Sequence, residues 1–254
     1  LERGGKLDEG LAVVRDVAAR MGQRLGPEDH RLARVVQVES GLLLDQGDVA
    51  GALRASERAL ALSARSPTPD PVWRGGLLGN IAVAEAGAGD LTAAIDAARR
   101  SLAEFRVAYP DDHAGLITPH QILGTLLRHD GQLEASDAIL RPALALADRT
   151  VPFDHPDRVN GVVELAMTEL ARGQAAAAAD RIATVMPVLA RPDWAALNLA
   201  EARFALARAT VAAGRARGPA IELARAARVG YVSLGPGYAE PVAAIDAWLA
   251  ANPR

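Results

Sequence analysis

The sequence predicts an all-α protein, a right-handed α-solenoid of stacked helix-turn-helix repeats with about twelve helices. The first observation behind this prediction is a glycine that recurs every 42 residues and once after 41. A fixed period of this length is typical of repeat proteins, in which each unit contacts only its neighbours. The second observation is composition, because half of the residues are apolar while only 4% are aromatic. Alanine, the best helix former, therefore supplies much of the core. The periodic glycines are Gly5, Gly47, Gly89, Gly131, Gly173 and Gly214.

The glycine register predicts the elements in order. A single solenoid domain, 1–254, is expected to begin with an unpaired second helix at 6–25 and to end with a closing helix at 238–251. Pro241 suits the first turn of that closing helix, where no backbone N–H is needed, and we expect Trp248 to pack back on the preceding pair. The five helix pairs between these ends are expected at about 28–66, 70–108, 111–149, 154–190 and 193–234.

The third repeat illustrates why each half is a helix. Asp111 and Asp112 are good N-cap residues, and leucines and isoleucines then recur at helical spacing. Gly131 ends this helix, because glycine readily adopts the left-handed conformation that closes many helices. A second apolar pattern follows from Leu133, and Pro142 inside it is expected to kink or break the helix.

Small residues recur in register with the glycines and predict close helix packing. They allow helix axes to approach to the short end of the usual range, about 8 Å. One position before the first small column stands an aliphatic residue in four repeats, whereas Glu39 stands there in the first pair and predicts looser packing. The small columns are Ser40, Ala82, Gly124, Ala166 and Ala207; Ala52, Ala94, Ser136 and Ala178; and Ala59, Ser101, Ala143, Val185 and Ala226. The aliphatic column is Ile81, Leu123, Leu165 and Leu206.

These columns resemble the tetratricopeptide repeat (TPR), which places Leu-Gly/Ala in its first helix and alanines in its second. The 42-residue spacing resembles the longer repeats of kinesin light chains, whose units are joined by a Gly-Pro-Asp-His-Pro loop. Similar segments here are "LGPEDH" (25–30), "YPDDH" (109–113) and "FDHPD" (153–157), with "TPDP" (68–71) as a degenerate copy. The resemblance covers essentially the whole chain.

A narrower resemblance concerns the C-terminal part. "EARFALARA" (201–209), "AGR" (213–215), the Tyr231 to Gly235 end and "AWLA" (247–250) look like the TPR tails of bacterial serine/threonine protein kinases, particularly those of myxobacteria. That resemblance implies a kinase domain upstream of Leu1. The chain also begins in the middle of a repeat, so we expect it to be a fragment of a longer polypeptide.

The TPR resemblance implies that ligands lie in a concave groove lined mainly by the first helix of each pair. Asn80 matches the asparagine that holds a ligand's backbone in many TPR proteins, since an amide can both donate and accept. The chaperone-type carboxylate clamp is not expected, because its slots hold Val38, Ile122 and Glu164. The groove residues implied are Arg34, Gln37, Asn80, Gln121, Thr125, Asn160, Glu164, Glu201 and Arg208, with Val38, Gly76, Gly79, Val83, Thr118, Ile122, Val163, Met167 and Phe204 as further inner-face positions.

Composition and motifs argue against several other functions. The net charge of −3 lacks the basic excess typical of nucleic-acid binding, and no apolar run is long enough to cross a membrane. The chain has no cysteine, its histidines lack zinc-site spacing, and "GPG" at 235–237 is no phosphate loop. We therefore expect no catalytic residues, metal or cofactor in this chain, and a cytoplasmic location.

The leading prediction is thus a non-catalytic scaffold that binds a peptide or partner protein, as the recruitment tail of a kinase. Two alternatives remain open. The first is a regulatory sensor in which a small molecule or signalling peptide alters the solenoid. The second is self-association through the first helix, whose apolar stripe of Leu7, Leu11, Val14 and Val17 would lack a partner helix.

Overall fold

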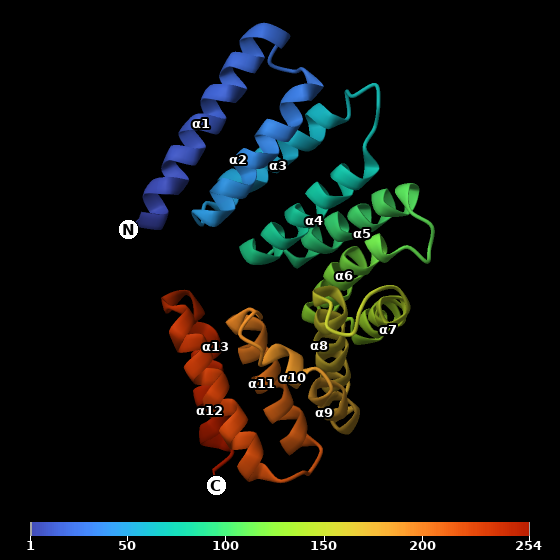
Figure 1. Cartoon of the computed structure of the whole chain (residues 1–254), viewed down its shortest axis with the longest axis vertical. Coiled ribbons are helices and arrows are strands. Elements are labelled where there is room, and N and C mark those ends of the chain that lie inside the picture. Colours follow the sequence, from blue (N-terminus) through green and yellow to red (C-terminus); the bar gives the residue numbers. More distant parts are fainter. Residues whose placement is uncertain (1, 254) are drawn as a thin grey trace. The chain divides into compact units, whose positions relative to one another are not determined.

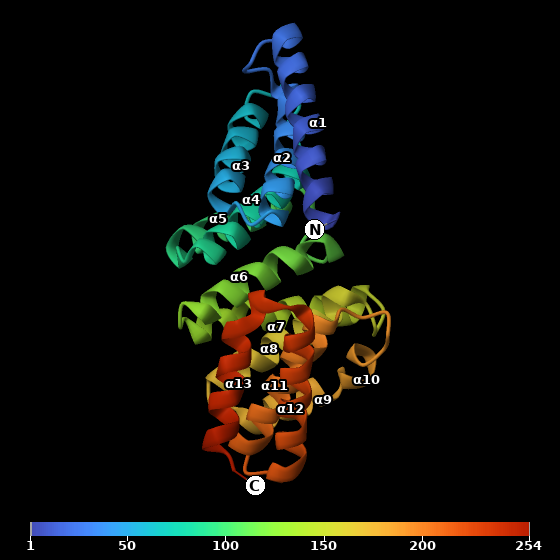
Figure 2. The same ribbon diagram turned by 90° about the vertical axis from the view of Figure 1, so that its left-hand side faces the viewer.

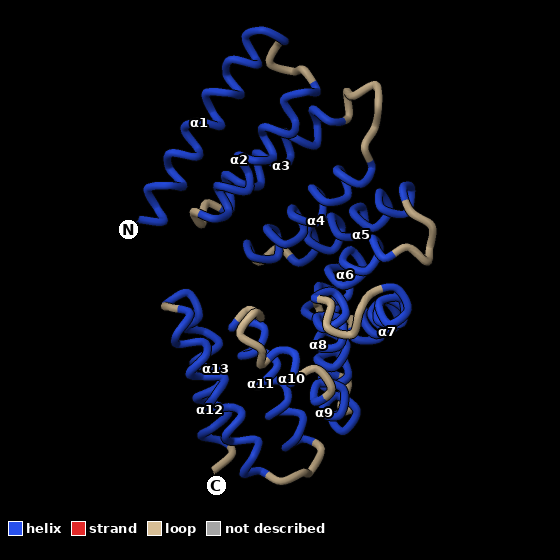
Figure 3. Tube along the Cα trace, in the orientation of Figure 1, coloured by secondary structure: helices blue, strands red, loops and turns tan. Residues whose placement is uncertain are grey.

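The computed structural model describes residues 2–253, with side chains from residue 7 onward, and every regular element in that range is helical. Figure 3 shows only helices and connecting loops. Thirteen α-helices and three short 3-10 helices (η1 to η3) make up these residues, which confirms the all-α prediction. Contacts divide the chain into two compact units, residues 1–130 and 131–254.

The first unit contains six α-helices, in which each helix packs on the next along the chain (Figure 1). Its second view, in Figure 2, again shows α1 running beside α2. The helices are α1 (Glu2–Leu25), η1 (His30–Leu32), α2 (Ala33–Asp45), α3 (Val49–Ser63), α4 (Pro71–Ala88), α5 (Leu91–Ala108), η2 (Ala114–Leu116) and α6 (Ile117–His129).

The second unit contains seven α-helices. Here α8 packs on both α7 and α9, and α11 packs on α9 and α12. The helices are α7 (Leu133–Thr150), α8 (Pro156–Ala171), α9 (Ala175–Ala183), α10 (Met186–Leu189), α11 (Ala196–Ala212), α12 (Arg217–Leu234), η3 (Pro236–Tyr238) and α13 (Ala239–Ala251).

The periodic glycines from Gly47 onward lie at successive equivalent turns, as predicted. Each has a positive φ, between 71° and 90°, in the left-handed region that a side chain disfavours. At Gly89 the turn is closed by two backbone bonds, from Gly89 N–H to the Ala86 carbonyl and from Asp90 N–H to the Glu85 carbonyl. This is the Schellman arrangement, and it satisfies carbonyls that the end of α4 would otherwise leave free.

Gly5 was expected at a turn, and that prediction is wrong, because α1 runs through it from Glu2 to Leu25. The apolar stripe predicted on this helix is also only partly open. Leu11 is buried, whereas Val17 is 39% exposed and Val13, outside the stripe, is 62% exposed. Self-association through α1 stays a prediction, and it would depend on these two valines.

The cap that begins the first helix of the third repeat differs from the one predicted. Asp111 and Asp112 lie in a turn before η2, and the capping acceptor is His113 Nδ1, which receives the Gly115 N–H at 3.0 Å. The reason is that the turn closes with a bond from His113 N–H to the Pro110 carbonyl, which leaves the histidine itself at the N-cap position. His155 caps α8 in the same way.

Two prolines affect the second helices differently. Pro142 lies within α7, which continues without the predicted break. The proline leaves the carbonyl of Ala138 without its helical hydrogen bond, but both residues are exposed, so water can bond that carbonyl. Pro187 instead lies in the first turn of α10, where its missing N–H is not needed, and the second helix of this repeat is split into α9 and α10. This split accounts for thirteen helices where about twelve were predicted.

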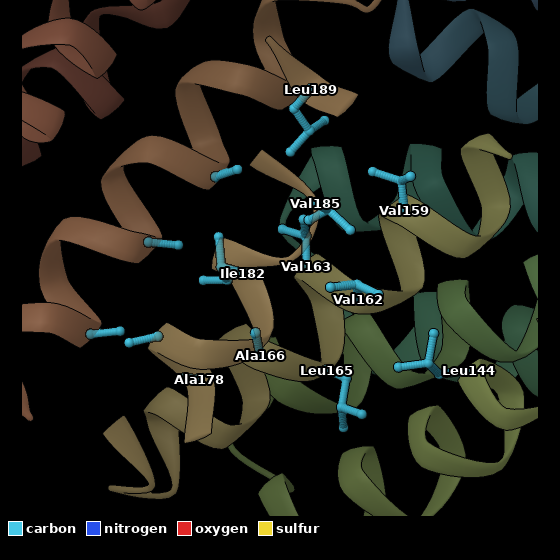
Figure 4. Packing of buried hydrophobic residues seen from close by; sticks show 14 of the residues in the cluster. Leu144, Val159, Val162, Val163, Leu165, Ala166, Ala178, Ile182, Val185 and Leu189 are labelled. Atoms are coloured by element: carbon cyan, nitrogen blue, oxygen red, sulfur yellow. The ribbon is translucent and has the colours of Figure 1, made fainter. Parts of the chain in front are cut away.

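The columns of small residues pack in the interior. Ala82, Ala94 and Ala166 are fully buried, as close helix packing requires. In the third small column the prediction is wrong at Ala226, which is only partly buried, while its neighbour Ala227 is buried. The reason is that α12 begins three residues after Gly214, whereas α9 begins two residues after Gly173. Larger side chains of the second unit pack in the same cluster as these small residues, as Figure 4 shows for Ile182, Val163 and Ala166.

Glu39 makes a polar contact where the other repeats have an aliphatic residue, and looser packing of the first pair stays a prediction. The Glu39 carboxylate accepts a bond from Arg15 Nε at 2.8 Å, in place of an aliphatic contact. Two neighbouring clefts of about 560 and 270 Å³ both have Arg15, Glu39 and Arg58 in their walls.

None of the described helices combines the length and apolar character needed to span a lipid bilayer.

Candidate functional site

In the first unit, the predicted groove residues lie on α2, α4 and α6, and contacts join the beginnings of α2 and α4. Arg34 Nη2 donates to Asp70 Oδ2 at 2.7 Å, and its guanidinium lies 5.5 Å from the centre of the Trp73 ring. Gln37 Oε1 accepts the indole N–H of Trp73. Asp70 also caps α4 by accepting the Trp73 backbone N–H at 3.0 Å. Arg34 and Gln37 are thus held in place by α4.

Farther along α4, the same face is left open. Asn80 is exposed, and its side chain makes no hydrogen bond with any residue that the structure describes. Val83 is 59% exposed, and Val38 on α2 is 52% exposed. A Cβ on Gly76 would meet no atom within 4 Å, so the backbone of α4 is accessible there. The face of α4 therefore offers an exposed amide and, one turn later, an exposed valine.

The predicted positions on α6 are more enclosed. Gln121 is only 8% exposed and Thr125 is partly buried. Their neighbour His120 has a pKa lowered below its usual value, mainly by burial, while its bond to the Leu116 carbonyl acts in the opposite direction. This stretch of α6 consequently adds no histidine charge near neutral pH.

In the second unit, the predicted position Asn160 on α8 pairs with an amide of α11 that was not predicted. Asn198 Nδ2 donates to Asn160 Oδ1 at 2.9 Å, which joins the beginnings of α8 and α11. Glu164, one turn after Asn160, is partly buried. This arrangement parallels the bond between Gln37 and Trp73 in the first unit.

The end of this face is aromatic and basic. The rings of Phe204 and Trp248 meet edge to face with centroids 6.0 Å apart, which confirms that the closing helix packs back on the preceding pair. Arg208 is exposed, and its guanidinium lies 5.8 Å from the Phe204 ring centre. Glu201, two turns before Arg208, is exposed. Burial raises the pKa of Tyr231 far above its usual value, and the charge of Glu201 adds to this effect.

The groove prediction missed Trp73 and Asn198, the residues that position Gln37 and Asn160. Both stand sixteen residues before a turn glycine, Gly89 and Gly214 respectively. A column at that register would have found them, although its other members, Arg31, Gly115 and Asp157, share no chemistry with them.

Among residues 7–253, whose side chains are described, no group of three or more histidine, aspartate or glutamate residues could hold a metal ion.

Comparisons with known proteins agree with the fold. A tetratricopeptide repeat family model matches residues 122–157. None of the curated proteins compared with the chain matches it in sequence.

Solved structures are similar over most of the chain. BtubC (BKLC) from P. vanneervenii is 15% identical, with a TM-score of 0.72, over 90% of this chain and 92% of that one. Nearly identical TPR-like repeats of kinesin-light-chain type from Podosopora anserina are 22% identical, with a TM-score of 0.58, over 85% and 97% of the two chains. YrrB, a TPR protein with an unusual peptide-binding site, is 15% identical, with a TM-score of 0.51, over 84% and 91%. At these identities the likeness shows the fold, an α-solenoid of TPR type.

Proposed function

We propose that this chain is a non-catalytic interaction module that binds an extended peptide or partner segment along the first helices of its repeats. The observation that carries the proposal is the open face of α4, where Asn80 is exposed one turn before exposed Val83 and the backbone at Gly76 is accessible. A free amide can both donate to a carbonyl and accept from an N–H, so it suits the backbone of any extended segment. YrrB, which shares the fold, has a peptide-binding site.

The remaining groove residues would contact the ligand in both units. Arg34 and Gln37 are oriented by Trp73 and Asp70, so they can meet a ligand with little further loss of side-chain freedom. Asn160, Glu164, Glu201 and Arg208 would provide a polar surface in the second unit, with Gln121 and Thr125 on α6 as less exposed positions.

A peptide library displayed against the whole chain tests this proposal. Peptides selected by the wild-type chain should bind about tenfold or more weakly to Asn80→Ala, because a backbone segment would lose both of its amide bonds. Gln23→Ala is the matched control, since Gln23 is an exposed amide on α1, outside the predicted groove. Undiminished binding by Asn80→Ala would contradict the groove assignment.

The module's place as the recruitment tail of a bacterial serine/threonine kinase is part of the proposal. It is supported by the resemblance of residues 201–250 to such tails. Reading the coding sequence upstream of residue 1 is the test: a kinase catalytic loop in the same frame is expected, and an unrelated domain there would overturn it.

A further inference from the structure

A cleft of about 590 Å³ lies in the first unit, where the loop before α4 meets the start of α2. Sites for small molecules in proteins commonly occupy about 300–1,000 Å³. The walls combine the indole of Trp73, Pro69 and Pro71 with the guanidinium groups of Arg31 and Arg34. The cleft therefore has the size and the mixed lining of a ligand site.

The next loop along the chain differs from this one in its rings. There Tyr109 and His113 stack with ring centroids 4.0 Å apart, and a Cβ on Gly115 would come within 2.6 Å of the tyrosine ring. The positions 42 residues earlier hold Pro67 and Pro71. Two stacked rings in one loop thus correspond to two prolines in the other.

Trp73 presents a fixed planar surface to this space. Its indole N–H is already bonded to Gln37, and the Arg34 guanidinium lies near its ring, so its orientation is set before any ligand arrives. Stacking of a planar ring on a tryptophan depends little on the identity of the ring.

The lining carries three guanidinium groups, each of which is paired with a carboxylate. Arg31, Arg34 and Arg74 line the cleft, and Asp70 is the one carboxylate among its described lining residues. The ion-pair partners of Arg31 and Arg74, Asp29 and Glu104, lie outside the lining. The Nε–H of Arg74 is buried and finds no acceptor among the described residues, so a donor remains unused. Guanidinium groups match the oxygens of a phosphate in geometry and charge.

From these features we infer that the cleft binds a small phosphorylated ligand with a planar ring, of which a mononucleotide is the simplest example. The ring stacks on Trp73 and the phosphate is held by Arg31 and Arg34. This site is separate from the binding of a peptide along α4 and does not depend on it. Of the predicted groove residues, Arg34 alone also lines the cleft, so the two sites share one side chain.

Calorimetric titration of the whole chain with AMP, GMP and UMP tests the inference. At least one mononucleotide should bind, whereas adenosine and inorganic phosphate, which each lack half of the contacts, should bind at least about tenfold more weakly. In a Trp194→Phe, Trp248→Phe background, Trp73 is the single tryptophan, and the same nucleotide should change its fluorescence.

Arg34→Gln should weaken nucleotide binding about tenfold, and it is a mild change because the side chain is 69% exposed. Arg54→Gln, at an exposed arginine of the same unit outside this cleft, should leave binding unchanged. The inference is overturned if no nucleotide binds at millimolar concentration, if inorganic phosphate binds equally well, or if Arg34→Gln binds as tightly as the wild type. Loss of peptide binding in Asn80→Ala with nucleotide binding intact would show that the two sites are independent.

Discussion

The turns of the second and fourth repeats share one backbone but differ in the side chains that support it. Gly89 and Gly173 have φ values of +90° and +78°. In the fourth repeat the Gln174 N–H bonds the Glu169 carbonyl at 2.8 Å, as the Asp90 N–H bonds the Glu85 carbonyl at 3.0 Å in the second. The two turns are therefore the same structure.

Their side chains act differently. In the second repeat Asp90 Oδ1 accepts the Ala93 N–H at 2.9 Å and caps α5. In the fourth repeat Gln174 makes no capping bond. There the Glu169 carboxylate, which is 2% exposed, accepts hydrogen bonds from Arg181 Nε and Nη2 at 2.9 and 2.8 Å. The comparison shows that one turn can be held either by an exposed cap or by a buried ion pair.

The largest effect is expected from the buried pair. Glu169→Ala leaves the Arg181 guanidinium without its bidentate acceptor and should lower the free energy of unfolding by about 3 kcal/mol. That figure is at the low end of the range for buried pairs, because Arg181 is 28% exposed and can be partly rehydrated. Urea denaturation measures it. Glu134→Ala is the control: this carboxylate is 84% exposed and lies 3.7 Å from Arg172, so its loss should cost under about 0.5 kcal/mol. Equal losses in the two variants would contradict the role given to burial.

The shared backbone predicts equal effects at the two glycines. Gly89→Ala and Gly173→Ala should each cost about 1–2 kcal/mol, because both require the left-handed conformation. A Cβ at either position meets no atom within 4 Å, so the cost is conformational. Gly87→Ala, two residues earlier within α4 and equally unobstructed, should instead stabilise by about 0.5 kcal/mol. Thermal unfolding of the three variants is the measurement, and a destabilised Gly87→Ala would refute the conformational explanation.

Removing the side chain after the turn glycine should affect stability differently in the two repeats. Asp90→Ala should cost about 1 kcal/mol and speed hydrogen exchange at the Ala93 amide, which loses its acceptor. Gln174→Ala should change stability little, since the side chain caps nothing. If the two variants lost the same stability, Asp90 would not be acting as a cap.

The smallest effect concerns acid stability in the second unit. Burial raises the pKa of Asp137, but bonds and charge from Arg141 and Arg172 outweigh it and hold that pKa below its usual value of 3.8. Because the folded carboxyl then has the lower pKa, its contribution is present above the unfolded pKa and is lost as pH falls below about 4. Asp137→Asn should remove under about 1 kcal/mol of this pH dependence. Urea midpoints at pH 7 and pH 3 measure it, and an unchanged difference between the two pH values would rule it out.

The helices and turns could be predicted because their causes are local. A glycine after an apolar helical pattern adopts the left-handed conformation wherever the chain places it, and alanines in register mark buried helix contacts. The failures have local causes too: Pro187 begins a new helix instead of continuing α9, and α12 starts one residue late and moves Ala226 out of its column.

The candidate sites could be predicted only in part. Inner-face positions follow from the repeat register, and several of them, such as Arg34, Gln37 and Asn160, do join consecutive first helices. Their partners Trp73 and Asn198 share a register but no common chemistry with the other repeats, so no pattern singled them out. The cleft beside Trp73 lies at the loop that has prolines where the next loop has stacked rings. This difference could be interpreted only after the structure showed that the two loops are equivalent.

The amino-acid sequence alone determined the period, the all-α fold and the positions of the turns from Gly47 to Gly214, because backbone conformation and helical periodicity act over a few residues. Tertiary structure decided which side chains are enclosed and which charges meet. Glu169 is paired with Arg181 across a turn, and Asn80 is left open on α4, because burial and ion pairing depend on distances between helices that no short segment specifies.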